Sequence, residues 1–470
     1  MKLIKSKTAN INYLSKIVKI DNFSSHPNPE YTKLKIAIID GFKIAVSIDM
    51  KEGYYVYFPA MSQINPQLLS YLNLYSNSEL NNDHNKKGFF DKNGRVKAIK
   101  LGGFPSEGFI MPFEQLNDWI TDSVAISLNI NDIKPNTEFD TVEHNGKTFW
   151  VSRKYIVPTN IKDDKLTGQY RNNKLKRFDK LIDGQFKFHY DTVLIRKEPQ
   201  AIQPTDLISI TSKIHGTSAI FSYILCKQPR NKKETFIMRL YDVFRGRYNK
   251  YDTKDYYAKY DYIYSSRSVI KNKNINPTTG EGFYQVDVWK YAFDYIKPYL
   301  LKGMTIYAEI VGFLPNGQYI QKSYDYGCRA PRPSEEYKEG THYKVFVYRI
   351  TMTNEDGQSF EYSARQVQQW CKSVGLKPVN ELYYGFAYDL YKDIEFDENW
   401  STNFIEHLAN DKDFFMEMSS PDCINKVPHE GIVIKKENMA PAAFKLKCFA
   451  FLNKEQQLLD KGTSNIEDEN

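Results

Sequence analysis

The sequence contains few cysteines and no hydrophobic run long enough to cross a membrane. Its five cysteines are scattered, odd in number and without a C-x-x-C pair: Cys226, Cys328, Cys371, Cys423 and Cys448. This pattern argues against a disulfide framework and against a zinc site. The basic N-terminus is not followed by an apolar segment of signal-peptide length. We therefore expect a soluble, cytoplasmic protein with no membrane partner.

The chain also lacks a strong excess of either charge, internal repeats and long low-complexity tracts. Its 64 lysines and arginines stand against 57 aspartates and glutamates, a net charge of +7. Such a mild excess is compatible with a nucleic-acid partner but does not require one. Aromatic residues are abundant, so most must be core, while some can stack on bases. The richness in Lys, Asn, Ile and Tyr would suit an AT-rich bacteriophage or virus, in which case the compartment is the host cytoplasm.

Short apolar runs separated by turn residues fill the first part of the chain. Residues 34–38 and 42–48 flank Asp40-Gly41, a two-residue hairpin signal. Five or six short strands joined by such turns favour a small barrel, of the OB type that often binds oligonucleotides. An Ig-like sandwich or another small β-module without a ligand is the alternative. We place this domain at residues 1–158.

The remaining two thirds of the chain contain a second substantial domain, predicted at residues 183–456, in which strands alternate with helices. A polar, basic stretch at 159–182 precedes it as a linker, and a polar tail at 457–470 is expected to be disordered. The clearest helix is 364–374, ended by Gly375 as a C-cap. Its apolar residues fall on one face, which indicates core packing.

The rest of the chain is arranged around Lys213-Ile214-His215-Gly216. This stretch lies between two strand-like runs, 207–211 and 219–225. A lysine is thereby placed where a strand ends and a turn begins, from which its amine can project into a pocket. Such a lysine is a candidate nucleophile, although a short motif of this kind is more often a solvated surface charge.

Four segments downstream carry further candidates for chemistry. They are the segment around Arg267, the strand 305–312 with Glu309, the strand 345–350 with Phe346 and Tyr348 on one face, and Glu430 to Lys435 followed by Lys445 and Lys447. Glu309 needs an explanation because an unpaired charge in an apolar strand is costly. Lys445 and Lys447 point the same way, as a phosphate clamp would require. Singly, each has a structural alternative in a salt bridge, a core ring or a solvated edge.

Taken in order, K-x-H-G, the arginine segment, Y-A-E-I-V-G, the aromatic strand, E-G-I-V-I-K and K-L-K resemble the motif series of the covalent nucleotidyltransferases. This superfamily contains ATP-dependent RNA and DNA ligases and mRNA capping enzymes. The histidine of K-x-H-G and the following Thr217-Ser218 are similar to the RNA ligase branch, and the N-terminal β-module to the RNA ligases with an OB domain before the catalytic domain. The resemblance covers about residues 183 to 453. It implies an α+β fold: a nucleotidyltransferase (ATP-grasp-like ligase) domain of antiparallel sheets with flanking helices, preceded by the OB-type barrel.

The resemblance also implies a role for each candidate. Lys213 would attack the α-phosphate of ATP and become a lysyl-adenylate, with Lys445 and Lys447 holding that phosphate and Lys435 assisting. Glu309 and Glu430 would serve Mg²⁺ or Mn²⁺ through water, with His215 near Glu430 and Glu309 also within reach of the ribose. The remaining nucleotide contacts would come from Ser218 and Arg267 on ribose or phosphate, Tyr348 or Phe346 on adenine, and Ser212.

Two positions depart from the family pattern. Ser212 stands where many RNA ligases have glutamate, which puts its adenine contact in doubt, and Arg349 stands where others often have an acid. Neither residue takes part in the covalent chemistry.

The implied reaction joins RNA 3′-OH and 5′-phosphate ends, including those of a nicked duplex, and we expect the enzyme to be a monomer. A DNA ligase or a capping-type guanylyltransferase would normally carry an OB domain after K-L-K, where only residues 448–470 remain. A non-catalytic OB-type nucleic-acid-binding protein would leave Lys213, Glu309 and Glu430 unexplained.

Overall fold

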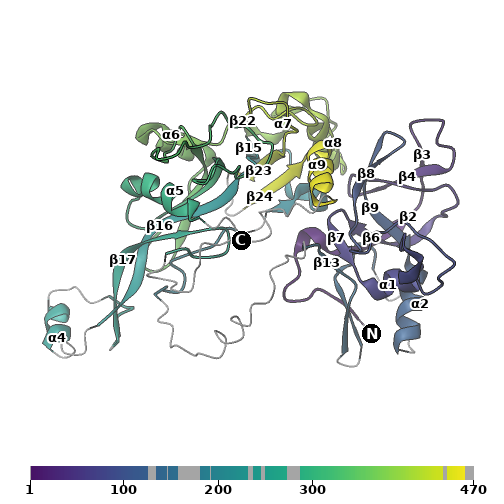
Figure 1. Ribbon diagram of the computed structural model, residues 1–470, viewed down its shortest axis with the longest axis horizontal. Helices are drawn as coiled ribbons and strands as arrows, with labels where there is room; N and C mark the ends of the chain where they lie inside the picture. The colour runs from purple at the N-terminus through teal and green to yellow at the C-terminus, as the bar shows by residue number, and fades with distance from the viewer. Residues whose placement is uncertain are drawn as a thin grey trace.

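The structure, a computed structural model, describes residues 2–124, 134–144, 147–156, 180–190, 192–230, 237–244, 249–253, 255–272, 286–437 and 442–460. Figure 1 shows two units, which we call the N-terminal unit (2–156) and the C-terminal unit (180–460). Most of the predicted linker and the end of the predicted tail lie outside the described residues. No helix in these ranges combines the length and apolar character needed to span a membrane.

The strands of the N-terminal unit form separate antiparallel sheets. The two larger sheets, by the number of residues in their strands, have the orders β10-β2-β6-β9-β8 and β3-β4-β5. The other two are β1-β11-β12 and β13-β7. The strands are β1 (Lys2–Ile4), β2 (Ser15–Ile20), β3 (Ser24–Ser25), β4 (Leu34–Ile39), β5 (Phe42–Ser47), β6 (Gly53–Pro59), β7 (Ser62–Ile64), β8 (Ala98–Leu101), β9 (Phe104–Pro112), β10 (Glu138–Phe139), β11 (Thr141–His144), β12 (Lys147–Trp150) and β13 (Ser152–Lys154).

None of the described sheets closes on itself, so the predicted OB-type barrel is not seen as such. The two larger sheets meet where β5 lies against β9. At this seam Ala45 N donates to the hydroxyl of Ser106 at 3.1 Å, so a side chain takes the place of a backbone acceptor. The seam therefore packs the two sheets together without a continuous backbone ladder.

The predicted hairpin at Asp40-Gly41 is confirmed. It joins β4 to β5, and Ile39 pairs with Phe42. Both turn residues have positive φ, 51° at Asp40 and 73° at Gly41, as the favoured two-residue turn requires. Helices α1 (Pro66–Tyr71) and α2 (Phe113–Val124) and the 3-10 turns η1 (Ile11–Tyr13) and η2 (Ser78–Leu80) complete the described part of this unit.

Two antiparallel sheets also build the C-terminal unit, with the orders β14-β24-β23-β15-β22 and β17-β16-β18-β19-β20. Among the described strands of this unit, only β14 on β24 and the short β21 on β19 pair in parallel. The strands are β14 (Val193–Leu194), β15 (Leu207–Ser212), β16 (Thr217–Pro229), β17 (Tyr256–Ser265), β18 (Met304–Gly312), β19 (Tyr343–Thr353), β20 (Ser359–Glu361), β21 (Lys377–Pro378), β22 (Glu381–Phe386), β23 (Gly431–Lys436) and β24 (Ala443–Lys447).

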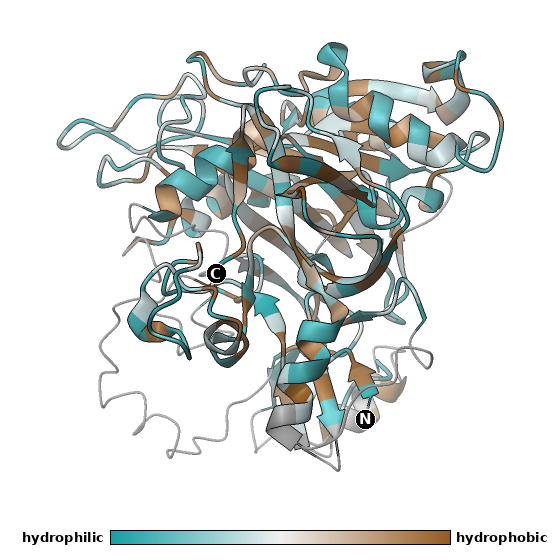
Figure 2. Ribbon diagram, turned by 90° about the vertical axis from the view of Figure 1, so that its right-hand side faces the viewer, coloured by the Kyte–Doolittle hydropathy of each residue, from teal (hydrophilic) through white to brown (hydrophobic). Residues whose placement is uncertain are grey.

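The described helices of this unit are α4 (Ile237–Phe244), α5 (Val288–Ile296), α6 (Ala364–Val374), α7 (Ala387–Leu390), α8 (Trp400–Asn410) and α9 (Phe449–Asp460), with 3-10 turns η4 (Ile195–Lys197), η5 (Pro199–Ala201), η7 (Lys297–Tyr299) and η8 (Lys412–Phe414). Helix α4 lies apart from the others, beyond the ends of β16 and β17 (Figure 1). One core joins α5 and α6 to the sheet of β16 to β19, and a second joins α7 and α8 to the sheet of β15 and β23. In Figure 2 the brown, apolar colour gathers along the strands between these helices.

The helix predicted at 364–374 is confirmed as α6. Ser363 and Gln366 form a capping box at its start, and Gly375, with a φ of 75°, ends it. Val367 and Cys371 are buried in the core, as predicted. The fold as a whole is therefore a mixed α/β fold of antiparallel sheets with flanking helices.

Helix α9 connects the two units. It starts directly after β24, where Glu417 accepts a hydrogen bond from the backbone of Ala450 at 3.0 Å, and it runs beside β8 of the N-terminal unit (Figure 1). At its end Asp460 pairs with Arg95, whose side chain is only 1% exposed, and with Lys97 at 3.2 Å. We call the Arg95–Asp460 pair the clasp.

Candidate active site

Lys213 stands at the end of β15, in a turn fixed by backbone contacts. Its amide donates to the carbonyl of Gly431 at 2.9 Å, which ties the end of β15 to the start of β23. Gly216, the last residue of K-x-H-G, has no room for a side chain, because a Cβ there would lie 2.6 Å from the carbonyl oxygen of Ile310. The glycine of the motif thus lets the turn approach β18, the strand that carries Glu309.

Glu430 is the centre of charge at this turn. Its carboxylate is 1% exposed and lies 2.6 Å from the Lys213 amine, 3.5 Å from that of Lys447 and 3.5 Å from Nδ1 of His215. Burial alone would raise the pKa of Glu430, but the charges of Lys213 and Lys447 and the hydrogen bond from His215 outweigh it and hold the pKa well below its usual range. Glu430 is therefore an anion that orients the Lys213 amine.

A cavity of about 110 Å³ lies between the two sheets of the C-terminal unit. We call it the inter-sheet cavity. One wall comes from the sheet of β15 and β23 and contains Ser209, Thr211, Val433, Lys435 and Ala443. The other wall comes from the second sheet and contains Glu309, Tyr348, Arg349 and Glu361. Lys213 also lines the cavity. The structure thus brings Lys213, Glu309, Tyr348 and Lys435 together around one cavity.

Of the two aromatic candidates, Tyr348 lines the inter-sheet cavity. Its hydroxyl is 3.5 Å from that of Ser218, and its ring meets His189 edge-on at 5.3 Å. Burial raises the pKa of Tyr348, so the phenol remains neutral. Phe346, on the same strand, instead packs against Tyr326 with ring centres 6.2 Å apart and joins the core behind the cavity.

Glu361 was missed by the sequence analysis. Its carboxylate pairs with Arg349 at 2.7 Å and with Lys435 at 2.7 Å, so two cations on the cavity wall share one negative charge. Lys435 also donates to the carbonyl of Tyr362 at 2.8 Å. Lys435, the predicted phosphate helper, is therefore already paired with Glu361 on the same wall of the cavity. Arg349, which departs from the family pattern, is paired with the same carboxylate. Glu361 lies in a strand of three residues with no motif, which is why no sequence signal points to it.

The hydroxyl of Ser212 faces a different set of partners from the one expected. It donates to the carboxylate of Asp422 and lies 3.0 Å from Nε2 of His429. Ser212 alternates with the buried Ile208 and Ile210 along β15 and is itself buried, although it also belongs to the lining of the inter-sheet cavity beside Ser209 and Thr211. The alternation of the strand, visible in the sequence, was the signal that the Ser212 side chain points to the interior.

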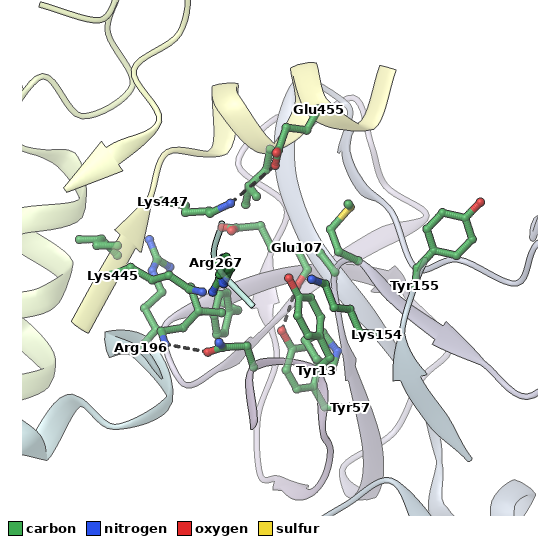
Figure 3. Close-up of a pocket in the computed structure, with 18 residues that line it drawn as sticks. Tyr13, Tyr57, Glu107, Lys154, Tyr155, Arg196, Arg267, Lys445, Lys447 and Glu455 are labelled. Carbon is green, nitrogen blue, oxygen red and sulfur yellow. Dashed lines mark hydrogen bonds and ion pairs between the residues drawn. The ribbon is translucent and has the colours of Figure 1, made fainter. Parts of the chain in front are cut away.

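A second cavity, of about 80 Å³, lies between the two units, and we call it the inter-unit cavity. Figure 3 shows Lys445 and Lys447 on one side of it and Tyr13, Tyr57 and Lys154 on the other. Its charged lining is Lys154, Arg196, Arg267, Lys445 and Lys447 with the acids Glu107 and Glu455. The five cations outnumber the two carboxylates, so the cavity suits an anion.

Both acids of the inter-unit cavity are partly neutralised. Burial raises the pKa of Glu107, against the opposing charge of Arg196, and Glu455 lies 3.7 Å from the Lys447 amine. Lys447 connects the inter-unit cavity to Glu430, since it lines that cavity and lies 3.5 Å from the Glu430 carboxylate. The predicted phosphate residues Arg267, Lys445 and Lys447 are thus gathered at one place, and Glu430 links them to Lys213.

The carboxylates of Glu309 and Glu430 supply the hard oxygen ligands that the predicted Mg²⁺ or Mn²⁺ prefers, but they do not form a closed metal site. Glu309 lines the inter-sheet cavity, and its Oε2 lies so close to Gly216 that a Cβ there would be 3.2 Å away. The described residues contain no group of three or more His, Cys, Asp or Glu side chains that could enclose a metal ion. Two separate carboxylates suit a hydrated Mg²⁺ or Mn²⁺, which keeps several of its waters, rather than a closed site.

A model of the RNA ligase family matches residues 206–448, just over half of the chain. The chain belongs to the RNA ligase family. The matched segment of this RNA ligase contains Lys213, Glu309, Glu430, Lys445 and Lys447, so every residue assigned to covalent chemistry lies inside it. Membership also decides against a non-catalytic binding protein, a DNA ligase and a capping enzyme.

Solved structures similar to this RNA ligase include those of an RNA ligase from Naegleria gruberi. The structure with PPi is 15% identical, with 95% of this chain and 100% of that chain covered and a TM-score of 0.49. A mutant with AMP and Mn is 14% identical, with 94% and 98% covered and a TM-score of 0.49. None of the curated proteins matches the chain.

Proposed function

We propose that this RNA ligase uses ATP and forms a covalent lysyl-adenylate on Lys213. The observation that carries the proposal is the 2.6 Å contact between the Lys213 amine and the buried Glu430, with Lys447 on the same carboxylate. An ordinary lysine has a pKa of about 10.4 and is almost wholly protonated at pH 7, so it must lose a proton before it attacks. Because the pKa of Glu430 is so low, we assign it to orienting the amine and not to keeping that proton.

The three proposed steps balance as follows. The Lys213 nitrogen bonds to the α-phosphorus of ATP, and pyrophosphate leaves. An oxygen of an RNA 5′-phosphate then attacks the same phosphorus, which breaks the nitrogen–phosphorus bond and frees the lysine. Finally an RNA 3′-OH attacks the 5′-phosphorus, and AMP leaves. Catalysis of this kind is mostly positioning and charge compensation.

We propose roles that follow the two cavities. The inter-sheet cavity would take the adenosine, with Tyr348 stacking on adenine, Ser218 and Glu309 near the ribose, and Thr211 beside Ser212 on the opposite wall. The inter-unit cavity would take the phosphates, with Arg267, Lys445 and Lys447 as their partners. When they bind, Lys447 can exchange its contact with Glu430 for the phosphate, because its side chain already lies between the two.

Glu309 and Glu430 would hold a hydrated Mg²⁺ or Mn²⁺ through water, and such an ion compensates phosphate charge. The relatives from Naegleria gruberi were solved with ATP and Mn or with AMP and Mn, which supports this choice of nucleotide and metal. Lys435 keeps a secondary role, since it is paired with Glu361.

We further propose that the N-terminal unit is an OB-type module whose two larger sheets form an opened barrel. The packing of β5 against β9 supports this, because it places the two sheets where a barrel would be continuous. RNA with 3′-OH and 5′-phosphate ends, nicked duplex included, is the proposed substrate of a monomer. The structure leaves all five cysteines free, which supports a reducing compartment such as the cytoplasm.

The test is to incubate the purified protein with Mg²⁺ and α-labelled ATP and to run a denaturing gel beside Lys213→Ala. We expect label on the wild type and none on the variant, since Lys447, the other lysine near Glu430, lies farther from the carboxylate, at 3.5 Å, and is proposed to bind phosphate. The matched control is Lys435→Ala, a lysine of the same cavity that is paired with Glu361 and should still be labelled. Label with GTP alone, or label on Lys213→Ala, would contradict the proposal.

A further inference from the structure

A groove on the N-terminal unit adjoins the inter-unit cavity. It has a volume of about 890 Å³ and is open to solvent along β7, α1 and the loops near Asn82 and Lys92. Tyr155 lines both the groove and the inter-unit cavity. Figure 3 shows Tyr155 at the edge of that cavity with its ring directed away from Lys445 and Lys447. The groove is therefore a direct extension of the place where phosphates are proposed to react.

The lining of the groove suits a polyanion with bases, because it contains no carboxylate. Its polar side chains are amides and a hydroxyl, those of Gln63, Gln67, Ser70, Asn82 and Asn93, with Lys92 as the cation. A comparable hollow on the C-terminal unit, of about 730 Å³, is lined by the acids Asp294, Glu335, Glu336 and Glu339 and the cations Arg332 and Lys338. Acids outnumber cations there, so the absence of acids from the groove is not a general property of this protein's surface.

Each class of side chain in the groove matches one part of a nucleotide. Amides donate and accept hydrogen bonds and can read base edges, and the half-buried ring of Tyr71 offers a face for stacking. Gln63 accepts a hydrogen bond from the exposed Arg153 at 2.9 Å, which places a second cation next to a residue of the groove. A space of this size holds a small ligand, or about one or two nucleotides.

We propose that this groove binds the unpaired RNA next to the end that is being joined. A strand whose phosphate lies in the inter-unit cavity would pass Tyr155 and place its next bases on Tyr71, Gln67 and Asn82. We expect the strand to be unpaired here, because the Watson–Crick edges of bases are open to amide side chains only when the bases are unpaired. The inference rests on the proposed function for the identity of the ligand, RNA. It adds the place on the N-terminal unit where the bases of that RNA are recognised.

The first experiment is photocrosslinking of the full-length protein to a single-stranded RNA that carries 4-thiouridine near its 5′-phosphate, without ATP. Crosslinks are expected in the peptides that contain Tyr71 or Lys92. Crosslinks confined to other parts of the chain would overturn the proposal. Because no nucleotide is added, the result does not depend on lysyl-adenylate formation, so failure of the groove and failure of the proposed chemistry are distinguishable.

The second experiment compares the double variant Gln67→Ala, Lys92→Glu with Lys100→Glu. All three residues are exposed, so the fold should be kept, and Lys100, on β8, lines neither the groove nor the inter-unit cavity. The double variant should raise the KM for RNA about tenfold, as loss of base and phosphate contacts does, and leave the rate of ATP-dependent labelling unchanged. An unchanged KM, or an equal rise in Lys100→Glu, would contradict the groove.

Discussion

The two cavities of this RNA ligase differ in how their walls are built. The inter-sheet cavity belongs to one unit, and its charges are paired inside it: Lys213 with Glu430, and Lys435 and Arg349 with Glu361. The inter-unit cavity is shared by both units, and its cations exceed its acids. The inter-sheet cavity, whose side chains are held in place before substrate binds, is therefore built by the C-terminal unit alone. The inter-unit cavity, which is proposed to bind the phosphates, needs the N-terminal unit to complete its wall.

The largest effect is expected from Glu430→Gln. The change keeps the shape of the side chain but removes the charge that orients Lys213, so labelling with α-labelled ATP should fall by about a hundredfold or more. The matched control is Glu361→Gln, which removes a carboxylate from the same cavity and leaves the Lys213 contact in place. Equal losses in the two variants would mean that total charge, and not orientation of the amine, is what matters.

The same variant should change how stability depends on pH. The pKa of Glu430 is lowered in the folded protein, so its contribution to the free energy of unfolding is complete above the ordinary glutamate value of about 4.3 and is lost as pH falls below it. Urea unfolding between about pH 6 and pH 3 should therefore show a steeper loss of stability in the wild type than in Glu430→Gln. Parallel curves would show that Glu430 is not the paired anion described above.

A smaller effect is expected when the aromatic wall is changed. Tyr348→Ala should raise the KM for ATP about tenfold, because loss of a stacking ring typically weakens the binding of a base to that extent. Phe346→Ala, two residues away on the same strand, should leave that KM nearly unchanged and lower the free energy of unfolding by about 3 kcal/mol through the cavity it leaves. The reverse result would assign adenine stacking to Phe346.

The smallest effect separates the two cavities. Asp460→Asn removes the charged partner of the buried Arg95, and we expect a severalfold slower reaction with ATP, since the inter-unit cavity would lose its fixed second wall. Binding of adenosine, which has no phosphate and is proposed to occupy the inter-sheet cavity, should not change. Asp460 is itself 39% exposed, so the loss of stability should be small, about 1 kcal/mol. Equal loss of adenosine binding would show that the two cavities do not act separately.

Local signals explain most of what could be predicted from the sequence. The Asp40-Gly41 hairpin and α6 each depend on residues adjacent in the chain, and both are confirmed. Family resemblance placed Lys213 and Glu430 in one site, and the structure brings them to 2.6 Å. Closure of the N-terminal strands depends on which distant strands pair, and no local signal encodes that, so the expected barrel was not found as a closed sheet.

The residues missed by the sequence analysis are those defined by long-range contacts. Glu361 gains its importance only because β20 brings it beside Arg349 and Lys435. Lys154 of the N-terminal unit and Arg196 of the C-terminal unit line one cavity only because the units pack together. For Ser212, by contrast, the sequence contained the answer, since its alternation with Ile208 and Ile210 already placed its side chain on the buried face of β15.

Helix α9 has a mechanical consequence. Its 12 residues correspond to a rigid rod of about 18 Å, anchored at one end to the strand of Lys445 and Lys447 and at the other to Arg95. Any rotation of the N-terminal unit must therefore either drag the two lysines with it or break the clasp. Opening the inter-unit cavity to release pyrophosphate or to admit an RNA end would thus be a concerted displacement of both walls, gated by a single carboxylate at position 460.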